Sequence, residues 1–143
     1  MAEFVNNPVQ EVAAGTPIPL NTSIACNKGF VYHREGSGIL TLRGKVNNPS
    51  SCFARYQVTF NANIAVPEDG TAGPISVAVA IDGEPINTSN AIVTPTVVNA
   101  YFNVTSTAMI TIPKGCCFNV AVENTSTAPI NVQNANLVVT RVA

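Results

Sequence analysis

The sequence is poor in charge and in the residues that most often carry catalysis. Of its 143 residues only 10% are charged, and it contains one histidine and no tryptophan. Soluble proteins typically carry about 25% charged residues. The formal net charge is −1 and the few Lys and Arg residues are spread thinly, so no basic patch is available to bind phosphate groups. We therefore expect no nucleic-acid partner.

Long hydrophobic runs and export signals are also missing. No apolar run reaches the roughly 18 residues of a membrane span. The first residues, MAEFVNNPVQ, contain neither the basic region nor the apolar region of a signal peptide. We therefore expect no membrane partner and synthesis in a cytoplasm. A protein of this kind that works in a virion, or on a spore or cell surface, would leave by a route such as lysis.

Cysteine is scarce, and its spacing does not favour a metal site. The four cysteines are Cys26, Cys52, Cys116 and Cys117, and none forms a C-x-x-C pair, which makes zinc a weak interpretation. Two interpretations stay open. The cysteines can be small buried hydrophobic residues, or one of the adjacent pair can form a disulfide with Cys26 or Cys52, within or between subunits, in oxidising surroundings.

Residues suited to acid or base chemistry are isolated or lie in turns. His33, in YHREGSG, is most simply a strand-end residue beside a turn. Glu68 and Asp69 share one loop that lacks any recognised calcium-binding pattern, and Asp82 and Glu84 flank a turn glycine. The sequence therefore predicts no enzyme and no cofactor.

The most regular feature of the sequence is the stretch RYQVTFNANIAV, from Arg55 to Val66. Apolar residues occupy every second position and polar residues fill the alternate face, which is typical of a long β-strand with one buried side. Burying its larger side chains is worth roughly 1.5–3 kcal/mol each, so a second sheet must cover them. The stretch therefore predicts a β-sandwich.

Other stretches alternate in the same way. Ile75 to Ile81 is followed by the hairpin signal Asp82-Gly83, and Cys117 to Glu123 reads as a further strand. Thr96 to Thr105 and Ala108 to Ile112 read as two more, and Ile130 to Val132 and Asn136 to Val142 read as the last two. The core predicted from these patterns comprises Tyr56, Val58, Phe60, Ile64, Val77, Val79, Phe118 and Val120.

No helical apolar period occurs, and turns recur about every 8–12 residues. We expect an all-β fold, an antiparallel jelly-roll β-sandwich of eight to ten strands. Pro17 and Pro19 cannot donate ladder hydrogen bonds, so residues 1–22 are expected to form an N-terminal arm or edge strand. Residues 23–143 then form a single jelly-roll domain.

Four stretches resemble the trimeric jelly-roll superfamily of C1q and tumour necrosis factor. They are GTPIPLN at Gly15 to Asn21, YQVTFNANIAV at Tyr56 to Val66, ISVAVAIDGEPINTS at Ile75 to Ser89 and NANLVVTRVA at Asn134 to Ala143. Within the superfamily the sequence most resembles the C-terminal domain of collagen-like exosporium glycoproteins, although it has no collagen repeat.

The resemblance implies a homotrimer. In that family the first and last strands lie together, and the aromatic-rich inner face of one sheet forms the trimer axis. This implies interface roles for Tyr101 and Phe102, and also for Tyr56. With no visible export signal, the chain also resembles a bacteriophage virion protein, such as a capsid decoration protein, head fibre or tail-tip module.

Two functions follow from these observations. The first is a non-enzymatic structural module that self-associates and decorates or caps a parent virion or surface layer. The second is a spore-surface or cell-surface module that binds glycans or a receptor through its polar loops, Pro67 to Pro74, Glu84 to Thr94 and Thr125 to Pro129. The absence of tryptophan, a common platform for sugars, favours the structural role.

Overall fold

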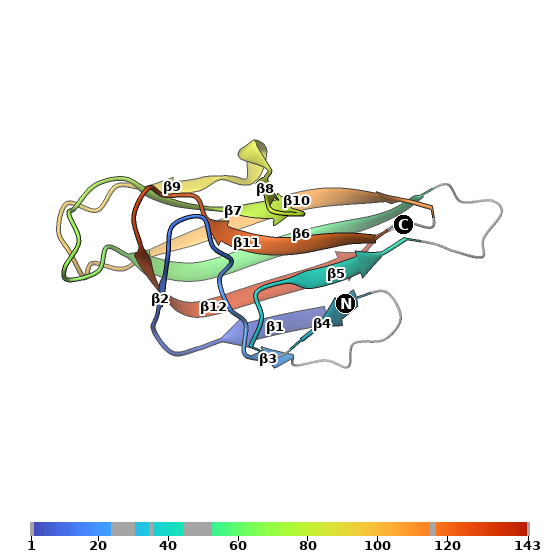
Figure 1. Cartoon of the computed structure of the whole chain (residues 1–143), viewed down its shortest axis with the longest axis horizontal. Coiled ribbons are helices and arrows are strands. Elements are labelled where there is room, and N and C mark those ends of the chain that lie inside the picture. Colours follow the sequence, from blue (N-terminus) through green and yellow to red (C-terminus); the bar gives the residue numbers. More distant parts are fainter. Residues whose placement is uncertain (1, 24–30, 35, 45–52, 115–116, 143) are drawn as a thin grey trace.

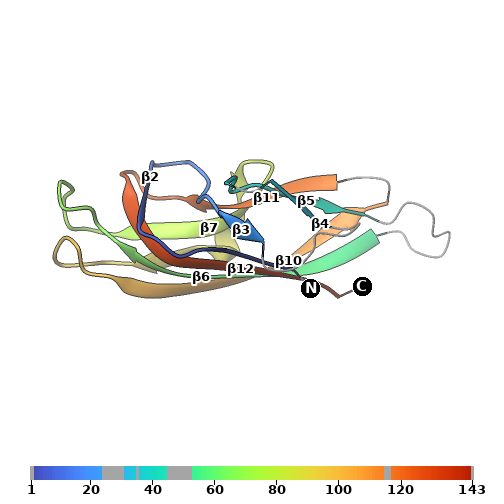
Figure 2. The same ribbon diagram turned by 90° about the horizontal axis from the view of Figure 1, so that it is seen from below.

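Two antiparallel sheets face each other in the computed structural model, which describes residues 2–23, 31–34, 36–44, 53–114 and 117–142 (Figures 1 and 2). The long sheet contains β1 (Ala2–Asn6), β2 (Gln10–Val12), β3 (Thr22–Ser23), β6 (Phe53–Ala65), β10 (Phe102–Pro113) and β12 (Ile130–Arg141). The short sheet contains β4 (Val31–His33), β5 (Leu40–Arg43), β7 (Ile75–Ile81), β8 (Glu84–Pro85), β9 (Ala91–Val93) and β11 (Cys117–Asn124). The all-β sandwich predicted from the sequence is confirmed, with twelve strands in the described part of the chain where eight to ten were expected.

The predicted central strand is β6, which pairs with β10 on one side and with β12 on the other. Its even-numbered side chains, from Ala54 to Ile64, point between the sheets, and its odd-numbered side chains face outward. The alternation predicted from the sequence therefore places its apolar face against the short sheet.

The predicted core residues lie between the sheets, with one difference. Tyr56, Val58, Phe60, Ile64, Val77, Val79 and Val120 are fully buried. Phe118 is only partly buried and packs against the edge of this core. Phe118 is the second residue of β11, close to the end of the sandwich, where fewer neighbours cover a side chain.

Two pairs of predicted strands are joined in the structure. The stretches expected around Thr96 to Thr105 and Ala108 to Ile112 become the single strand β10, which begins only at Phe102 and pairs with β6 along its whole length. Ser106 does not interrupt it because the buried hydroxyl of Ser106 donates a hydrogen bond to the carbonyl of Ser89. The C-terminal stretches likewise form one strand, β12, with an irregularity between Gln133 and Asn136.

Residues 2–23 are built into both sheets, where the sequence predicts an arm or edge strand. β1 lies between β12 and β3 in the long sheet. Further along, the amide groups of Gly15 and Ile18 donate hydrogen bonds of 2.8 Å to carbonyls of β11 in the short sheet. Four apolar side chains of this segment are buried in the common core: Phe4, Val12, Ile18 and Leu20.

The hairpin predicted at Asp82-Gly83 joins β7 to β8. Both turn residues have positive φ angles, 50° at Asp82 and 84° at Gly83, as the common two-residue hairpin turn requires. After β8, the 3-10 helix η1 (Asn87–Ser89) leads into β9, which returns to pair with β7. The expected binding loop Glu84 to Thr94 is therefore largely ordered structure along the side of the sandwich.

Candidate functional site

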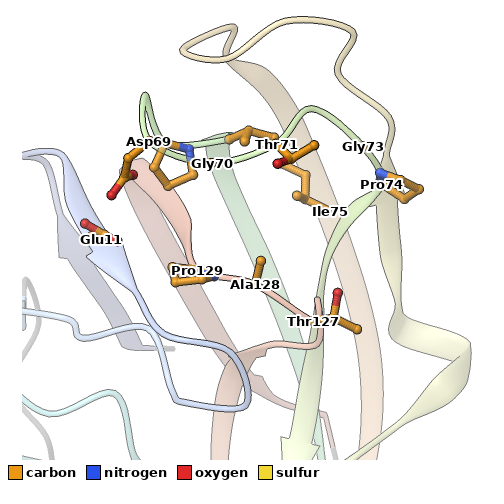
Figure 3. Close-up of a pocket in the computed structure, with 12 residues that line it drawn as sticks. Glu11, Asp69, Gly70, Thr71, Gly73, Pro74, Ile75, Thr127, Ala128 and Pro129 are labelled. Carbon is orange, nitrogen blue, oxygen red and sulfur yellow. The ribbon is translucent and has the colours of Figure 1, made fainter.

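Two of the three predicted binding loops meet at one end of the sandwich. The connection after β6, residues 66–74, and the connection between β11 and β12, residues 125–129, lie at the end opposite the two chain termini (Figure 1). They enclose a pocket of about 480 Å³, which we call the loop-end pocket (Figure 3). Its volume falls within the range of roughly 300–1,000 Å³ that small-molecule sites occupy.

The loop-end pocket has apolar walls and an acidic edge. Its walls come mainly from Pro67, Pro74, Ile75, Ala128 and Pro129. The side chains of Glu11 and Asp69 lie at the same end of the pocket in Figure 3. A second hollow of about 450 Å³ shares both carboxylates and adds Glu68, Asn99 and Asn131. Because no described lysine or arginine lines either hollow, the region favours neutral or positively charged ligands.

Local hydrogen bonds hold the loops of this pocket in place. Asn124 is fully buried and its side-chain amide donates to the carbonyls of Val12 and Ala128, both at 3.0 Å. Its side-chain oxygen accepts the Ser126 amide at 2.9 Å. In the other loop the Gly70 amide donates to the Pro67 carbonyl at 2.9 Å. These bonds reduce the ordering that a ligand would have to impose.

Sequence reasoning missed Glu11 and Asn124 as parts of this site. Glu11 lies in β2, far along the chain from both loops, and reaches them because β2 pairs with the start of β12. Asn124 reads in the sequence only as the first residue of an Asn-Thr-Ser motif. Its position at the end of an apolar strand is the one feature of the sequence that could have indicated that its side chain holds a loop in place.

His33 has a structural role. The ring is buried, its Nε2 group donates to the Ser37 carbonyl at 2.8 Å, and its Nδ1 atom accepts the Ser23 hydroxyl at 2.9 Å. Its ring also contacts that of Phe4, with 4.7 Å between centroids. Both ring nitrogens are therefore occupied in holding β4 to the neighbouring segments.

The three aromatic residues implied as interface residues separate in the structure. Tyr101 and Phe102 are 38% and 44% exposed at the start of β10. Tyr56 is fully buried, and its hydroxyl donates to the Arg43 carbonyl at 2.6 Å. Burial raises the pKa of Tyr56, an effect that the charge of Arg141 partly opposes. The implied interface role of Tyr56 is therefore wrong, because its ring packs between the sheets.

Cys117 begins β11 and is exposed. Cys26, Cys52 and Cys116 lie outside the described residues, so a disulfide involving any of them remains a prediction. Within the described ranges, no group of three or more His, Cys, Asp or Glu side chains is placed to hold a metal ion. The same part of the chain contains no helix of the length and apolarity needed to span a membrane.

No family model matches the chain, and no curated protein sequence matches it either. Its fold is similar to the globular domain of the zebrafish complement 1qA protein, with a TM-score of 0.59 and 15% identity over 96% of this chain and 94% of that domain. A CBM35 domain from Cellvibrio japonicus Abf62 aligns over 99% of this chain and 98% of its own at 10% identity, but with a TM-score of only 0.35. The first likeness and the pairing of β1 with β12 show that the chain has a C1q-like jelly-roll fold.

Proposed function

We propose that this protein is a non-enzymatic module that self-associates, as a homotrimer, through the outer face of its long sheet. The observation that supports this proposal most directly is the amino-acid composition of that face. Cross-strand pairing forms rows that run across it, such as Val5, Asn136, Asn61 and Thr105, followed by Glu3, Val138, Thr59 and Thr107. Most of these side chains are uncharged, so covering them requires little desolvation of charge.

Hydrogen bonds within the face support this proposal. The hydroxyls of Thr59 and Thr107 lie 3.3 Å apart, and the Asn103 amide donates to the side-chain oxygen of Asn61 at 2.8 Å. The Asn136 amide donates to the Glu3 carboxylate at 2.9 Å. Polar groups that are already paired cost less to bury than groups that must give up water.

The proposed contact face differs from the aromatic-rich face implied by the resemblance. Tyr56 and Phe60 point into the core, and the outward positions of β6 are mainly amides and hydroxyls. Exposed apolar side chains lie nearer the ends of the face, at Phe53 and Met109, and at Tyr101 just before β10. We therefore propose a trimer axis lined by polar rows, with Tyr101 and Phe102 covering one end.

The experiment uses light scattering to measure the solution mass of Thr59→Arg and of a matched control, Thr94→Arg. Thr59 lies near the middle of the face, whereas Thr94 is exposed beyond β9. We expect Thr59→Arg to give monomers because it brings like charges together near a symmetry axis, and Thr94→Arg to remain trimeric. Both variants should melt cooperatively. A parent protein that is monomeric, or a folded Thr59→Arg trimer, would overturn the proposal.

We propose that the trimer decorates or caps a larger assembly. The favoured assembly is a bacteriophage virion, and the alternative is a spore surface. A low-charge surface rich in Asn, Ser and Thr, together with an ordered self-association face, supports a packing role. Binding of the purified protein to virions that lack it tests the first setting. Binding to spores but not virions would move the proposal to the alternative.

A second candidate function is recognition of a surface glycan or receptor, and the loop-end pocket favours it. The pocket combines apolar walls with the carboxylates of Glu11 and Asp69, which can accept hydrogen bonds from sugar hydroxyls. A glycan array probed with parent protein and with Asp69→Asn tests this function. Binding that the substitution abolishes would support it, and an array without any signal would count against glycans.

A further inference from the structure

A further pocket, smaller than the two hollows at the loop end, lies on the outer face of the short sheet. We call it the Glu123 pocket. It has a volume of about 230 Å³. The side chains of Asn119, Ala121 and Glu123, at alternate positions of β11, form its floor, because the intervening Val120 and Val122 point into the core. Pro17 and Ile39 lie along one side, and the turn at Asp82 and Gly83 lies along the other.

Glu123 is the unusual residue of this pocket. It is only 8% exposed, yet no hydrogen bond or ion pair of the described residues reaches its carboxyl group. Its backbone lies between Ala78 of β7 and Pro17 of the N-terminal segment. Burial raises the pKa of Glu123, which reflects the cost of keeping an unpaired carboxylate away from water.

The remaining surroundings of the pocket carry a second carboxylate. Among the residues that the structure describes, Asp82 is the only other titratable group that lines it, and the Asp82 carboxylate accepts a hydrogen bond from the backbone amide of Asn119 at 3.0 Å. Gly38 has no space for a side chain because a Cβ atom there would lie 2.9 Å from the Pro17 Cβ, which holds the wall at Pro17 close to the sheet. No lysine or arginine in the described part of the chain lines the pocket.

We propose that the Glu123 pocket binds an aliphatic primary ammonium group. The carboxylate of Glu123 accepts hydrogen bonds from the ammonium group, Asp82 adds a second negative charge, and Pro17, Ile39 and Ala121 contact the carbon chain. The volume is below the range of drug-sized sites, so one protruding side chain or one small amine fills it. A lysine side chain of a partner and an amino sugar share this chemistry.

The binding test uses n-butylammonium chloride as the probe and follows the amide NMR signals of Gly83, Asn119 and Ala121 at neutral pH. We expect saturable shifts with n-butylammonium and none with 1-butanol, which has a similar chain but no charge. Glu123→Gln should weaken binding by about tenfold or more, because it removes the charge that accepts the ammonium donors. Glu84→Gln, an exposed carboxylate next to the turn but outside the pocket, should bind as the parent does.

A second variant keeps the test independent of the charge change. Ala121→Leu leaves both carboxylates in place and fills the floor of the pocket, so it should also abolish the shifts. Absence of saturable shifts in the parent would show that the pocket does not bind the ammonium ion, and equal binding by parent and Glu123→Gln would show that the Glu123 carboxylate does not hold it. Either result would overturn the proposal. Titration with N-acetyl-lysine methylamide and with glucosamine then distinguishes a lysine side chain from an amino sugar.

The outcome of the n-butylammonium titration does not depend on whether the protein forms the proposed trimer. The pocket lies on the short sheet, whereas the proposed self-association face belongs to the long sheet (Figure 2). A monomeric protein that binds n-butylammonium would overturn the trimer alone. A trimer without binding would overturn the pocket alone.

Discussion

At the scale of single residues, small side chains decide how closely the segments of the sandwich approach. Gly38 lies against the backbone carbonyl of Ile18 and the Cβ of Pro17, where the N-terminal segment meets the short sheet. Gly73, in the loop at the loop-end pocket, has no described atom within 4 Å of the position where a Cβ would stand, apart from its own atoms and those of its two chain neighbours. An added methyl group would therefore clash with neighbouring atoms at Gly38 but not at Gly73.

We expect Gly38→Ala to lower the free energy of unfolding by about 1–3 kcal/mol, because a methyl group there forces the Ile18 carbonyl to move. Gly73→Ala should change it little, or raise it by about 0.4–1 kcal/mol through the unfolded chain. Urea unfolding of the two variants and the parent measures both effects. Equal stability of Gly38→Ala and the parent would show that the wall at Pro17 is not tightly packed.

Glu123 makes stability depend on pH. Because burial raises its pKa, the folded chain retains this proton at pH values where the unfolded chain has released it. The stabilisation by the protonated carboxyl is complete below the ordinary pKa of a glutamate and is lost as pH rises through the raised pKa. We therefore expect Glu123→Gln to melt at a higher temperature than the parent at pH 7.

The control for this prediction is pH itself. The gap in melting temperature between Glu123→Gln and the parent should shrink as pH falls below the ordinary range of a glutamate pKa. Thermal melts of both proteins across this range measure the gap. A gap that stays constant, or that grows on acidification, would mean that burial of the carboxylate carries no cost in the folded protein.

At the scale of elements, the N-terminal segment shows where sequence patterns reach their limit. Pro17 and Pro19 argue correctly against a central strand there, but they do not reveal that the segment pairs with β12 and then crosses to β11. β10 is a second example, since Ser106 and Thr107 interrupt the apolar pattern but not the strand. Full pairing with β6 outweighs the local preference, which is typical of strands.

Deletion of residues 2–20 is expected to prevent folding rather than assembly alone. The deletion removes β1 and β2 and also the buried side chains of Phe4, Val12, Ile18 and Leu20. Each of these larger apolar side chains contributes roughly 1.5–3 kcal/mol through burial, and their sum is comparable with the whole folding free energy of a typical domain, about 5–15 kcal/mol. Circular dichroism melting measures the outcome. A truncated chain with a cooperative transition near that of the parent would show that the segment is a separable arm.

At the scale of the whole molecule, the sandwich presents three surfaces with different chemistry. The outer face of the long sheet carries mainly amides and hydroxyls, the loop end is acidic, and the short sheet carries the Glu123 pocket. The first suits copies of the same chain, and the other two suit ligands with hydrogen-bond donors. A trimer formed through the long sheet would leave the Glu123 pocket, on the other sheet, accessible.

We expect the light-scattering mass of the parent protein to correspond to a trimer both with and without reductant. Contacts between sheet faces do not depend on a disulfide, whichever cysteines are oxidised. A trimer that falls to monomers in reductant would instead place disulfides of the cysteines at Cys26, Cys52, Cys116 or Cys117 between subunits. A monomer under both conditions would remove the proposed assembly and leave the fold unchanged.

The sequence by itself determined the strands and their faces, because the alternation of side chains along a strand is a local property. The residues from Arg55 to Val66 specify a buried face for β6 before any partner is known, and Asp82-Gly83 specifies a hairpin. Only the tertiary structure decided which segments form the two pockets. Glu11 and Asp69, or Pro17 and Glu123, lie far apart in the chain and meet through long-range strand pairing. Such pairing depends on the packing of the whole sandwich, so no local pattern could predict these sites.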